Sequence, residues 1–461
     1  MVAVCFYFQV HQPFRLRKYS IFDIGQNSDY FDEKKNSEII RKVASKCYLP
    51  TNKILLDLIK NNDGKFKVSF SISGVALEQF ERYAPEVLHS FRELAKTGCV
   101  EFLNETYFHS LSYLFDKEEF SQQVKMHRDK IKDLFGQEAK AFRNTELVYN
   151  NELANFVQGM GYNAIVAEGA DHILGWRSPN FIYTPKAVGS MKLLLKNYRL
   201  SDDIAFRFSN KGWSEHPLSV EKYASWISDV NGNGNVVNLF MDYETFGEHQ
   251  WEDTGIFEFL KRLPAEVMKN PDNSFVTISE AATLYPSVAE MDMHSFVSWA
   301  DVERDLSAWL GNPLQNSAAR ELYKLGRLVK ATDDKALISD WRKLTTSDHF
   351  YYMCIKWFSD GDVHKYFNPY DSPYEGFISF MNALNDIAIR VREIANKDVS
   401  VFNHVKALTL VTEQGTSMSQ GKVCESPAEK LYETIMNDPE SFMSKINSSK
   451  ADDSDSLFDQ K

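Results

Sequence analysis

The chain has 461 residues, of which 43% are hydrophobic and 25% charged, which is the composition of an ordinary globular protein of about two to three domains. Its formal net charge of −12 argues against a nucleic acid partner, because phosphate groups favour a basic surface. The same charge is compatible with a neutral substrate, and the 13% of aromatic residues could supply both a core and rings that stack on sugars.

Strand and helix patterns alternate over residues 1–255, which predicts an α/β fold with a parallel sheet or barrel. Apolar runs predict seven strands, at 2–10, 66–73, 99–106, 139–146, 163–168, 203–208 and 235–242. Amphipathic patterns predict helices between them, for instance at 51–61, 75–97, 117–135 and 150–160. We expect this part of the chain to form the catalytic domain.

A helical region that packs on the barrel is predicted for residues 256–398. Apolar residues recur at helical spacing in 304–310, 318–330, 336–344 and 376–394. A segment rich in Asp and aromatic residues, 357–374, interrupts this pattern, and its turn residues predict an exposed loop that lines a site. The remaining residues, 399–461, form a C-terminal extension whose polar composition predicts partial disorder.

The cysteines and the N-terminus suggest a cellular location. The five cysteines are odd in number and widely scattered, so we expect neither a disulfide framework nor a cysteine-rich zinc site. The apolar start, 1–8, lacks a basic lead and is too short for a signal peptide, and no other run is long enough to span a membrane. We therefore expect a cytoplasmic protein that does not bind a membrane.

Two acidic residues end predicted apolar strands. Glu146 follows Ala141-Phe-Arg-Asn-Thr, and Asp242 follows Val236-Val-Asn-Leu-Phe-Met. Desolvation disfavours a charged carboxylate at such a position, so chemistry or a tight ion pair usually explains one. The carboxyl ends of parallel strands gather at one face, so these two residues predict a shared site. Two facing carboxyl groups are the minimum that cleavage of a glycosidic bond requires.

Each of these assignments has a local alternative. Arg143 could form a structural ion pair with Glu146, although on a regular strand the two side chains would point to opposite faces. Glu244 would share the face of Asp242, and Glu248 lies just beyond. We favour Asp242 because it ends the apolar run most directly.

Two histidines also follow predicted strands. His11 belongs to His11-Gln12-Pro13 after the first strand, and His109 lies just past the third. A histidine at a strand end can equally be a polar cap that bonds to the backbone. Two histidines and two carboxylates beyond strand ends together favour a single polar pocket.

These segments resemble those of family 57 of the glycoside hydrolases, which are retaining α-glucan enzymes. The resemblance spans about residues 1–395 and rests on five regions: His11-Gln12-Pro13; Gly98-Cys-Val-Glu-Phe with His109; Phe142-Arg-Asn-Thr-Glu-Leu-Val-Tyr-Asn150; Asp242-Tyr-Glu-Thr-Phe-Gly-Glu-His249; and Thr346-Ser-Asp-His-Phe-Tyr-Tyr352 with the Trp357 loop. The third and fourth regions look like the α-amylase type. The family implies an incomplete, seven-stranded TIM-like barrel followed by a helical C-terminal region.

The resemblance also implies roles for residues. Glu146 would be the nucleophile, and Asp242 would be the general acid/base, which must hold a proton at neutral pH. The carboxyl groups of a retaining enzyme lie about 5–5.5 Å apart. We expect no cofactor and no metal ion. The substrate, an α-glucan or maltooligosaccharide, would be bound by His11, Gln12, His109, Trp213, Glu244, Trp251, Trp299, Asp348, His349 and Trp357, although each tryptophan could equally belong to the core.

Three other interpretations stay open. The chain could be a 4-α-glucanotransferase, which passes the glycosyl group to a sugar instead of water. It could be a catalytically silent glucan-binding protein on the same fold. It could be a zinc enzyme like related barrel deacetylases and mannosidases, but Pro13 cannot bind zinc where those enzymes need a ligand. Activity that survives a strong chelator would argue against zinc.

Overall fold

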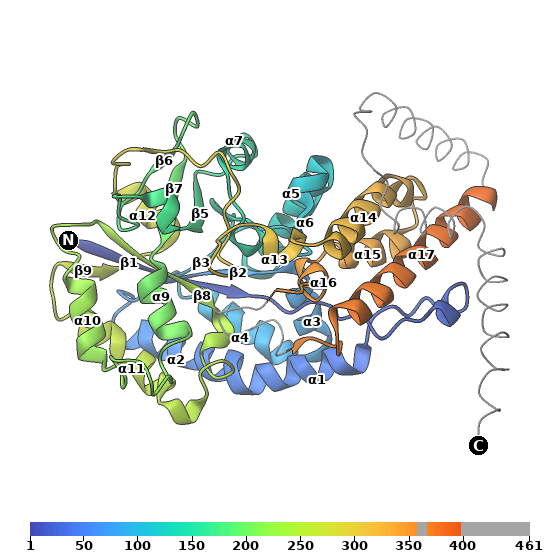
Figure 1. Ribbon diagram of the computed structural model, residues 1–461. Coiled ribbons are helices and arrows are strands. Elements are labelled where there is room, and N and C mark those ends of the chain that lie inside the picture. The colour runs from blue at the N-terminus through green and yellow to red at the C-terminus, as the bar shows by residue number, and fades with distance from the viewer. Residues whose placement is uncertain (357–366, 398–461) are drawn as a thin grey trace, which may run out of the picture. The chain divides into compact units, whose positions relative to one another are not determined.

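The strand β1 (Val2–Val10) lies inside a parallel sheet, and all of its residues are buried. The structure is a computed structural model that describes residues 1–356 and 367–397 (Figure 1). Around β1 the order is β3-β2-β1-β8, and β9 pairs with the start of β1. The other strands of this sheet are β2 (Val68–Ile72), β3 (Val100–Phe102), β8 (Val236–Asp242) and β9 (Asn273–Phe275).

A second parallel sheet has the order β4-β5-β7, with β4 (Ala141–Arg143), β5 (Ala164–Glu168) and β7 (Lys192–Lys196). Single contacts join the edges of the two sheets: Asn104 bridges to Phe142, and the Asn197 amide donates to the Asn238 carbonyl at 2.9 Å. Two short strands, β6 (Thr184–Pro185) and β10 (Glu290–Met291), form a separate pair. The α/β fold with parallel sheets is thus confirmed.

Alternate residues of β1 serve two different cores, because successive side chains on a strand point to opposite faces. Phe6 and Phe8 pack in the cluster that includes the surrounding helices. Cys5 and Tyr7 pack toward residues of the second sheet, such as Leu194. The strand is therefore apolar at every position except Gln9, as expected of a parallel strand that is covered on both faces.

Helices connect the strands. Those before β8 are α1 (Glu33–Val43), α2 (Leu49–Asn61), α3 (Gly74–Tyr83), α4 (Pro85–Ala95), α5 (Ser112–Phe115), α6 (Lys117–Phe135), α7 (Asn151–Gly159), α8 (Asp171–Leu174), α9 (Tyr198–Ala205) and α10 (Val220–Ser228). The helix predicted at 75–97 is in fact two helices, because the chain breaks at Ala84 and Pro85 begins α4. Proline disfavours a helical conformation of the residue before it.

The strand predicted at 203–208 is wrong. Residues up to Ala205 belong to α9, whose Asn197 side chain accepts a hydrogen bond from the Leu200 amide and begins the helix. The polar–apolar alternation of this segment was too short to distinguish a strand from one turn of an amphipathic helix. The strand in this part of the chain is β7, an apolar run flanked by two lysines.

The helices that follow β8 are α11 (Ile256–Val267), α12 (Ile278–Leu284), α13 (Ser307–Leu310), α14 (Pro313–Ala331), α15 (Lys335–Leu344), α16 (Ser347–Tyr351) and α17 (Pro373–Lys397). Helices α13 to α17 share a core around Trp309 and Trp341, and they lie together in Figure 1. β9 also follows residue 255 but pairs with β1, and a domain boundary at 255 stays a prediction. In the described ranges no helix is long and apolar enough to cross a membrane. The extension predicted at 399–461 lies outside the described residues.

Candidate active site

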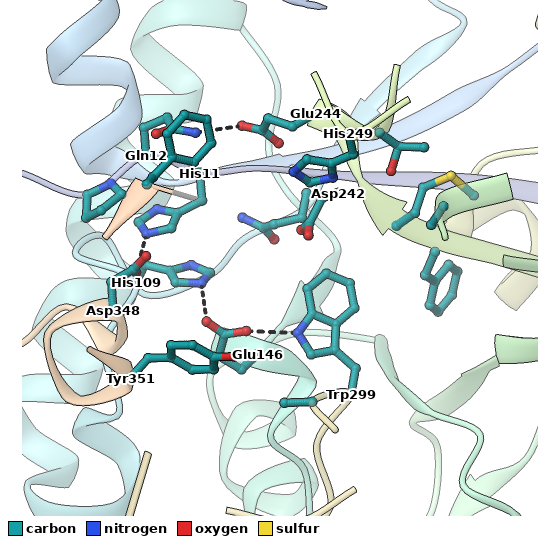
Figure 2. Close-up of a pocket in the computed structure, with 18 of the residues that line it drawn as sticks. His11, Gln12, His109, Glu146, Asp242, Glu244, His249, Trp299, Asp348 and Tyr351 are labelled. Atoms are coloured by element: carbon teal, nitrogen blue, oxygen red, sulfur yellow. Dashed lines mark hydrogen bonds and ion pairs between the residues drawn. The ribbon is translucent and has the colours of Figure 1, made fainter. Parts of the chain in front are cut away.

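One pocket brings together side chains from distant parts of the chain (Figure 2). Eight of the predicted site residues line it: His11, Gln12, His109, Glu146, Asp242, Glu244, Trp299 and Asp348. They come from the carboxyl ends of strands, from the turn after β4, and from the helical region. Lining residues without a predicted role include Gln9, Arg15, Lys196, His249 and Tyr351.

Glu146 lies on a tight turn, not on a strand. β4 ends at Arg143, and Glu146 and Leu147 have φ angles of 58° and 51°. Residues other than glycine rarely adopt this left-handed conformation, and such strained residues are enriched at active sites. Arg143 is fully buried, lies over the Trp299 ring at 5.0 Å from its centroid, and has its Nη1 atom 3.9 Å from Glu105.

The buried Glu146 carboxylate is surrounded by hydrogen-bond donors (Figure 2). Trp299 Nε1 donates to Oε2 at 2.8 Å, and Ser347 Oγ donates to Oε1 at 3.1 Å. His109 Nε2 lies 3.4 Å from Oε1. Donors to a carboxylate stabilise its charged form, so this environment suits an anion that faces the pocket.

The two predicted histidines stack on each other, with their ring centroids 3.9 Å apart. His11 Nε2 lies 2.9 Å from Asp348 Oδ2, and His11 Nδ1 lies 2.7 Å from Ser73 Oγ. Burial, together with the charge of His109, lowers the pKa of His11. A neutral His11 therefore donates from Nε2 to Asp348 and accepts the Ser73 hydroxyl at Nδ1.

His109 has the opposite electrostatic character. Burial acts to lower its pKa, but the hydrogen bonds with Glu105 and Glu146 outweigh that effect and raise the pKa to about 9. At neutral pH the pocket therefore holds a neutral His11 and a positively charged His109. The charged ring lies directly beside the Glu146 carboxylate.

Asp242 and Glu244 lie on the side of the pocket formed by β8 (Figure 2). Asp242 is the last residue of β8 and pairs in register with Gln9 of β1. Glu244 accepts hydrogen bonds from Gln12 Nε2, at 3.2 Å, and from the Tyr48 hydroxyl. Burial, and then the charge of Asp242, raise the pKa of Glu244 to about 8. Glu244 therefore carries a proton at neutral pH.

Three predicted substrate-binding residues do not line this pocket. Trp213 packs against Trp226, and Trp251 is half exposed beside Lys46. His349 is buried against Phe380 in the helical core. The sequence could not separate these rings from pocket residues, because both kinds lie next to apolar positions. A role of these three residues in substrate binding stays a prediction, and Trp357 lies outside the described residues.

Two charged residues near the site, Glu105 and Lys196, were not predicted, although both lie at or just after the end of an apolar strand. Glu105 follows the apolar end of β3, just as Glu146 follows β4, and Lys196 ends β7. Lys196 is buried and lies 3.1 Å from Asp202, and its Nζ atom lies 5.6 Å from the Trp299 ring centroid. Glu105 and Lys196 thus share with Glu146 and Asp242 a position at or shortly after the end of a buried strand.

In the part of the chain that the structure describes, no group of three or more His, Cys, Asp or Glu side chains is arranged to hold a metal ion. His11 uses both ring nitrogens for the contacts with Ser73 and Asp348.

Comparisons with known proteins show which family the chain belongs to. The model of glycosyl hydrolase family 57 matches residues 5–294. A protein of Methanocaldococcus jannaschii named "Putative alpha-amylase" is 45% identical over 412 residues, which is 86% of each chain. A branching enzyme of this family from Pyrococcus horikoshii has a similar fold, with a TM-score of 0.61 and 16% identity over 92% of this chain and 98% of that one.

A 4-alpha-glucanotransferase from Thermococcus litoralis is also similar in fold, with a TM-score of 0.58 and 18% identity. The match covers 76% of this chain but only 56% of that one, so this chain corresponds to about half of the larger enzyme. The family model covers well over half of the present chain, and the archaeal relative matches most of it. The chain belongs to glycosyl hydrolase family 57.

Proposed function

We propose that the protein is a retaining glycoside hydrolase that cleaves α-1,4-linked glucans, as an α-amylase does. One observation carries the proposal: the Glu146 carboxylate accepts hydrogen bonds from Trp299 and Ser347 in a pocket that it shares with Asp242. A buried, donor-supported carboxylate suits a nucleophile, and a second carboxyl group in the same pocket suits an acid/base. The name of the archaeal relative supports a starch-like or glycogen-like substrate.

The chemistry would proceed in two steps. Asp242 gives its proton to the glycosidic oxygen while Glu146 attacks the anomeric carbon, so that the glycosidic bond breaks and a glycosyl-enzyme forms. Asp242, now ionised, then takes a proton from water as that water attacks the anomeric carbon, and Glu146 is released. The two carboxyl groups should lie about 5–5.5 Å apart in this mechanism, and a separation near 9 Å would contradict it.

Several pocket residues are suited to bind sugar hydroxyl groups. The neutral His11 and the Asp348 carboxylate form a fixed pair at the pocket wall. Arg15 Nη2 donates to Gln12 Oε1 at 2.8 Å, which orients the Gln12 amide. Glu244 retains its proton up to about pH 8 and could donate a hydrogen bond to a hydroxyl group. Trp299 could also stack on a sugar ring.

The pocket lies at the carboxyl ends of the strands, as in barrel enzymes. We propose that the two parallel sheets form the incomplete seven-stranded barrel of the family. The contacts of Asn104 with Phe142 and of Asn197 with Asn238, at the two edges between the sheets, support this arrangement.

Maltoheptaose incubation tests the proposal directly. Shorter maltooligosaccharides with new reducing ends would show hydrolysis, whereas a ladder that includes longer products would show glycosyl transfer and favour a 4-α-glucanotransferase. Glu146→Gln should abolish turnover but keep maltoheptaose binding, measured by calorimetry. Unchanged turnover in this variant would contradict the role of Glu146, and binding without turnover in the unaltered protein would favour a silent glucan-binding protein.

A further inference from the structure

Glu105 lies next to the pocket but does not line it, and its side chain is fully buried. Its Oε1 atom accepts hydrogen bonds from Gln9 Nε2 at 3.1 Å and from Ser71 Oγ at 2.6 Å. Its Oε2 atom lies 2.8 Å from His109 Nδ1, and Arg143 Nη1 is 3.9 Å away. Every one of these neighbours is a donor or a cation, so the site is built for an anion.

The electrostatics agree with this geometry. Burial acts to raise the pKa of Glu105, but the hydrogen bond and the charge of His109, together with the charge of Arg143, hold that pKa far below its ordinary value. Glu105 is therefore ionised at neutral pH. No step of the proposed reaction uses this buried charge.

His109 lies between two carboxylates. Nδ1 faces Glu105, and Nε2 faces Glu146 Oε1 at 3.4 Å. The backbone holds the ring in this position: His109 has a φ of 51°, its amide donates to the Thr106 carbonyl, and its own carbonyl accepts the Ser347 amide at 2.9 Å. A neutral imidazole can donate from only one nitrogen, so donation to both carboxylates requires the imidazolium form.

We propose that Glu105 is a positioning residue for the nucleophile: it binds the Nδ1–H of His109 and so keeps this ring doubly protonated, with Nε2–H directed at Glu146. The proposal rests on the proposed role of Glu146. It explains why a second carboxylate lies buried behind the pocket. It also changes the role of His109, which holds the nucleophile and not only the sugar.

The other charged or titratable groups around His109 are compatible with this arrangement. His11 stacks on one face of the ring, and its own pKa is lowered by burial and by His109. His127, on α6, is also buried with a lowered pKa, and it hydrogen-bonds to the Ile72 carbonyl at 2.7 Å. Arg143 acts against the positive charge of His109, while Glu105 and Glu146 favour it. The two carboxylates are therefore the groups that keep His109 charged.

The variant Glu105→Gln isolates the charge of this residue. The glutamine Oε1 atom can still accept the Nδ1–H bond, but it carries no negative charge, so His109 should lose a proton at lower pH. The neutral ring would keep hydrogen at Nδ1 and present the lone pair of Nε2 to Glu146. A lone pair facing a carboxylate is repulsive, so the nucleophile would lose a donor and its position.

The test is the pH profile of kcat/KM on maltoheptaose, together with an NMR titration of the His109 ring, assigned by its absence in His109→Gln. In Glu105→Gln we expect both the alkaline limb of kcat/KM and the ring titration to move at least one pH unit lower. At pH values above that limb, kcat/KM of the variant should then be about tenfold lower than that of the unaltered protein. The acid limb should stay near its original place. A ring titration at the original pH, or an equal loss of rate at every pH, would overturn the proposal.

Two further variants separate charge from structure. Glu119→Gln removes another fully buried carboxylate, which does not line this pocket and accepts a hydrogen bond from Arg342 Nε at 2.7 Å. This variant should lower the stability of the protein without moving the pH profile. Glu105→Asp keeps the charge and should keep the alkaline limb even if kcat falls. It serves as the test if Glu105→Gln does not fold, and an alkaline limb displaced in this aspartate variant would also overturn the proposal. If the unaltered protein has no turnover, the proposed function fails, but the NMR titration still tests the link between Glu105 and His109.

Discussion

Replacing Trp299 by Phe removes one identified hydrogen bond from the proposed nucleophile. The Nε1–H of Trp299 donates to Glu146 Oε2 at 2.8 Å. The charged groups of Arg143 and Lys196 lie over the ring, 5.0 Å and 5.6 Å from its centroid. Phenylalanine keeps an aromatic face for these cations but has no N–H group. The backbone hydrogen bond from Trp299 to the Glu146 carbonyl, at 3.2 Å, is also independent of the side chain.

The expected size follows from the type of bond. A hydrogen bond to a charged group contributes about 1.5–3 kcal/mol, and one pH unit corresponds to about 1.36 kcal/mol. The ionised nucleophile loses that stabilisation in Trp299→Phe, so the acid limb of kcat/KM should move about one to two pH units higher. Below that limb the rate should fall by about 10- to 100-fold, and near the optimum the loss should be smaller.

The assay is kcat/KM on maltoheptaose from pH 4 to 9, with reducing ends as the readout. Trp309→Phe is the matched control, because Trp309 is fully buried in the helical core and its Nε1 atom has no hydrogen-bond partner in the described residues. This control should lose some stability but keep the acid limb. An acid limb that stays in place in Trp299→Phe, or that moves equally in both variants, would refute the electrostatic role of Trp299.

Two other predictions concern stability. Gly326→Ala on α14 should lower the free energy of unfolding by about 1–3 kcal/mol, because a Cβ atom there would lie 2.3 Å from Trp341 Cζ2. The effect is measured by thermal melting. The control is Gly159→Ala, which should not destabilise the protein, because nothing lies within 4 Å of a Cβ atom at that position. For Glu244, the folded pKa of about 8 lies above the ordinary 4.5, so the unfolded chain releases this proton first and stability is lost as pH rises between these values. In the unaltered protein the free energy of unfolding should fall by up to about 5 kcal/mol between pH 4.5 and 8 because of this residue, and in Glu244→Gln this decrease should be absent. Urea unfolding at several pH values is the measurement. Equal pH dependence in both proteins would contradict the burial of a protonated Glu244.

Some features of the site could be predicted from sequence because they follow from local pattern and topology. Apolar strands that alternate with amphipathic helices produce parallel sheets, and the carboxyl ends of such strands meet at one face. Glu146 and Asp242, acidic residues expected at the ends of such strands, were therefore expected in one pocket; both line it, although Glu146 lies on the turn after β4. His11 and His109 followed by the same argument. The length of β1 was also predicted fully, because burial on both faces makes all of its residues but Gln9 apolar.

The tertiary structure alone decided which neighbours surround each charged group. The bond between Glu105 and His109 joins residues only four positions apart, yet it requires the left-handed backbone at His109, which no periodic pattern indicates. Trp299 and Trp213 look alike in sequence, but Trp299 contacts a carboxylate 153 positions away while Trp213 packs against Trp226. The sequence thus determined where carboxylates lie at the ends of strands. Long-range packing determined which of them is held ionised, because hydrogen-bond donors from distant segments, and the loss of water around them, set the charge of a buried group.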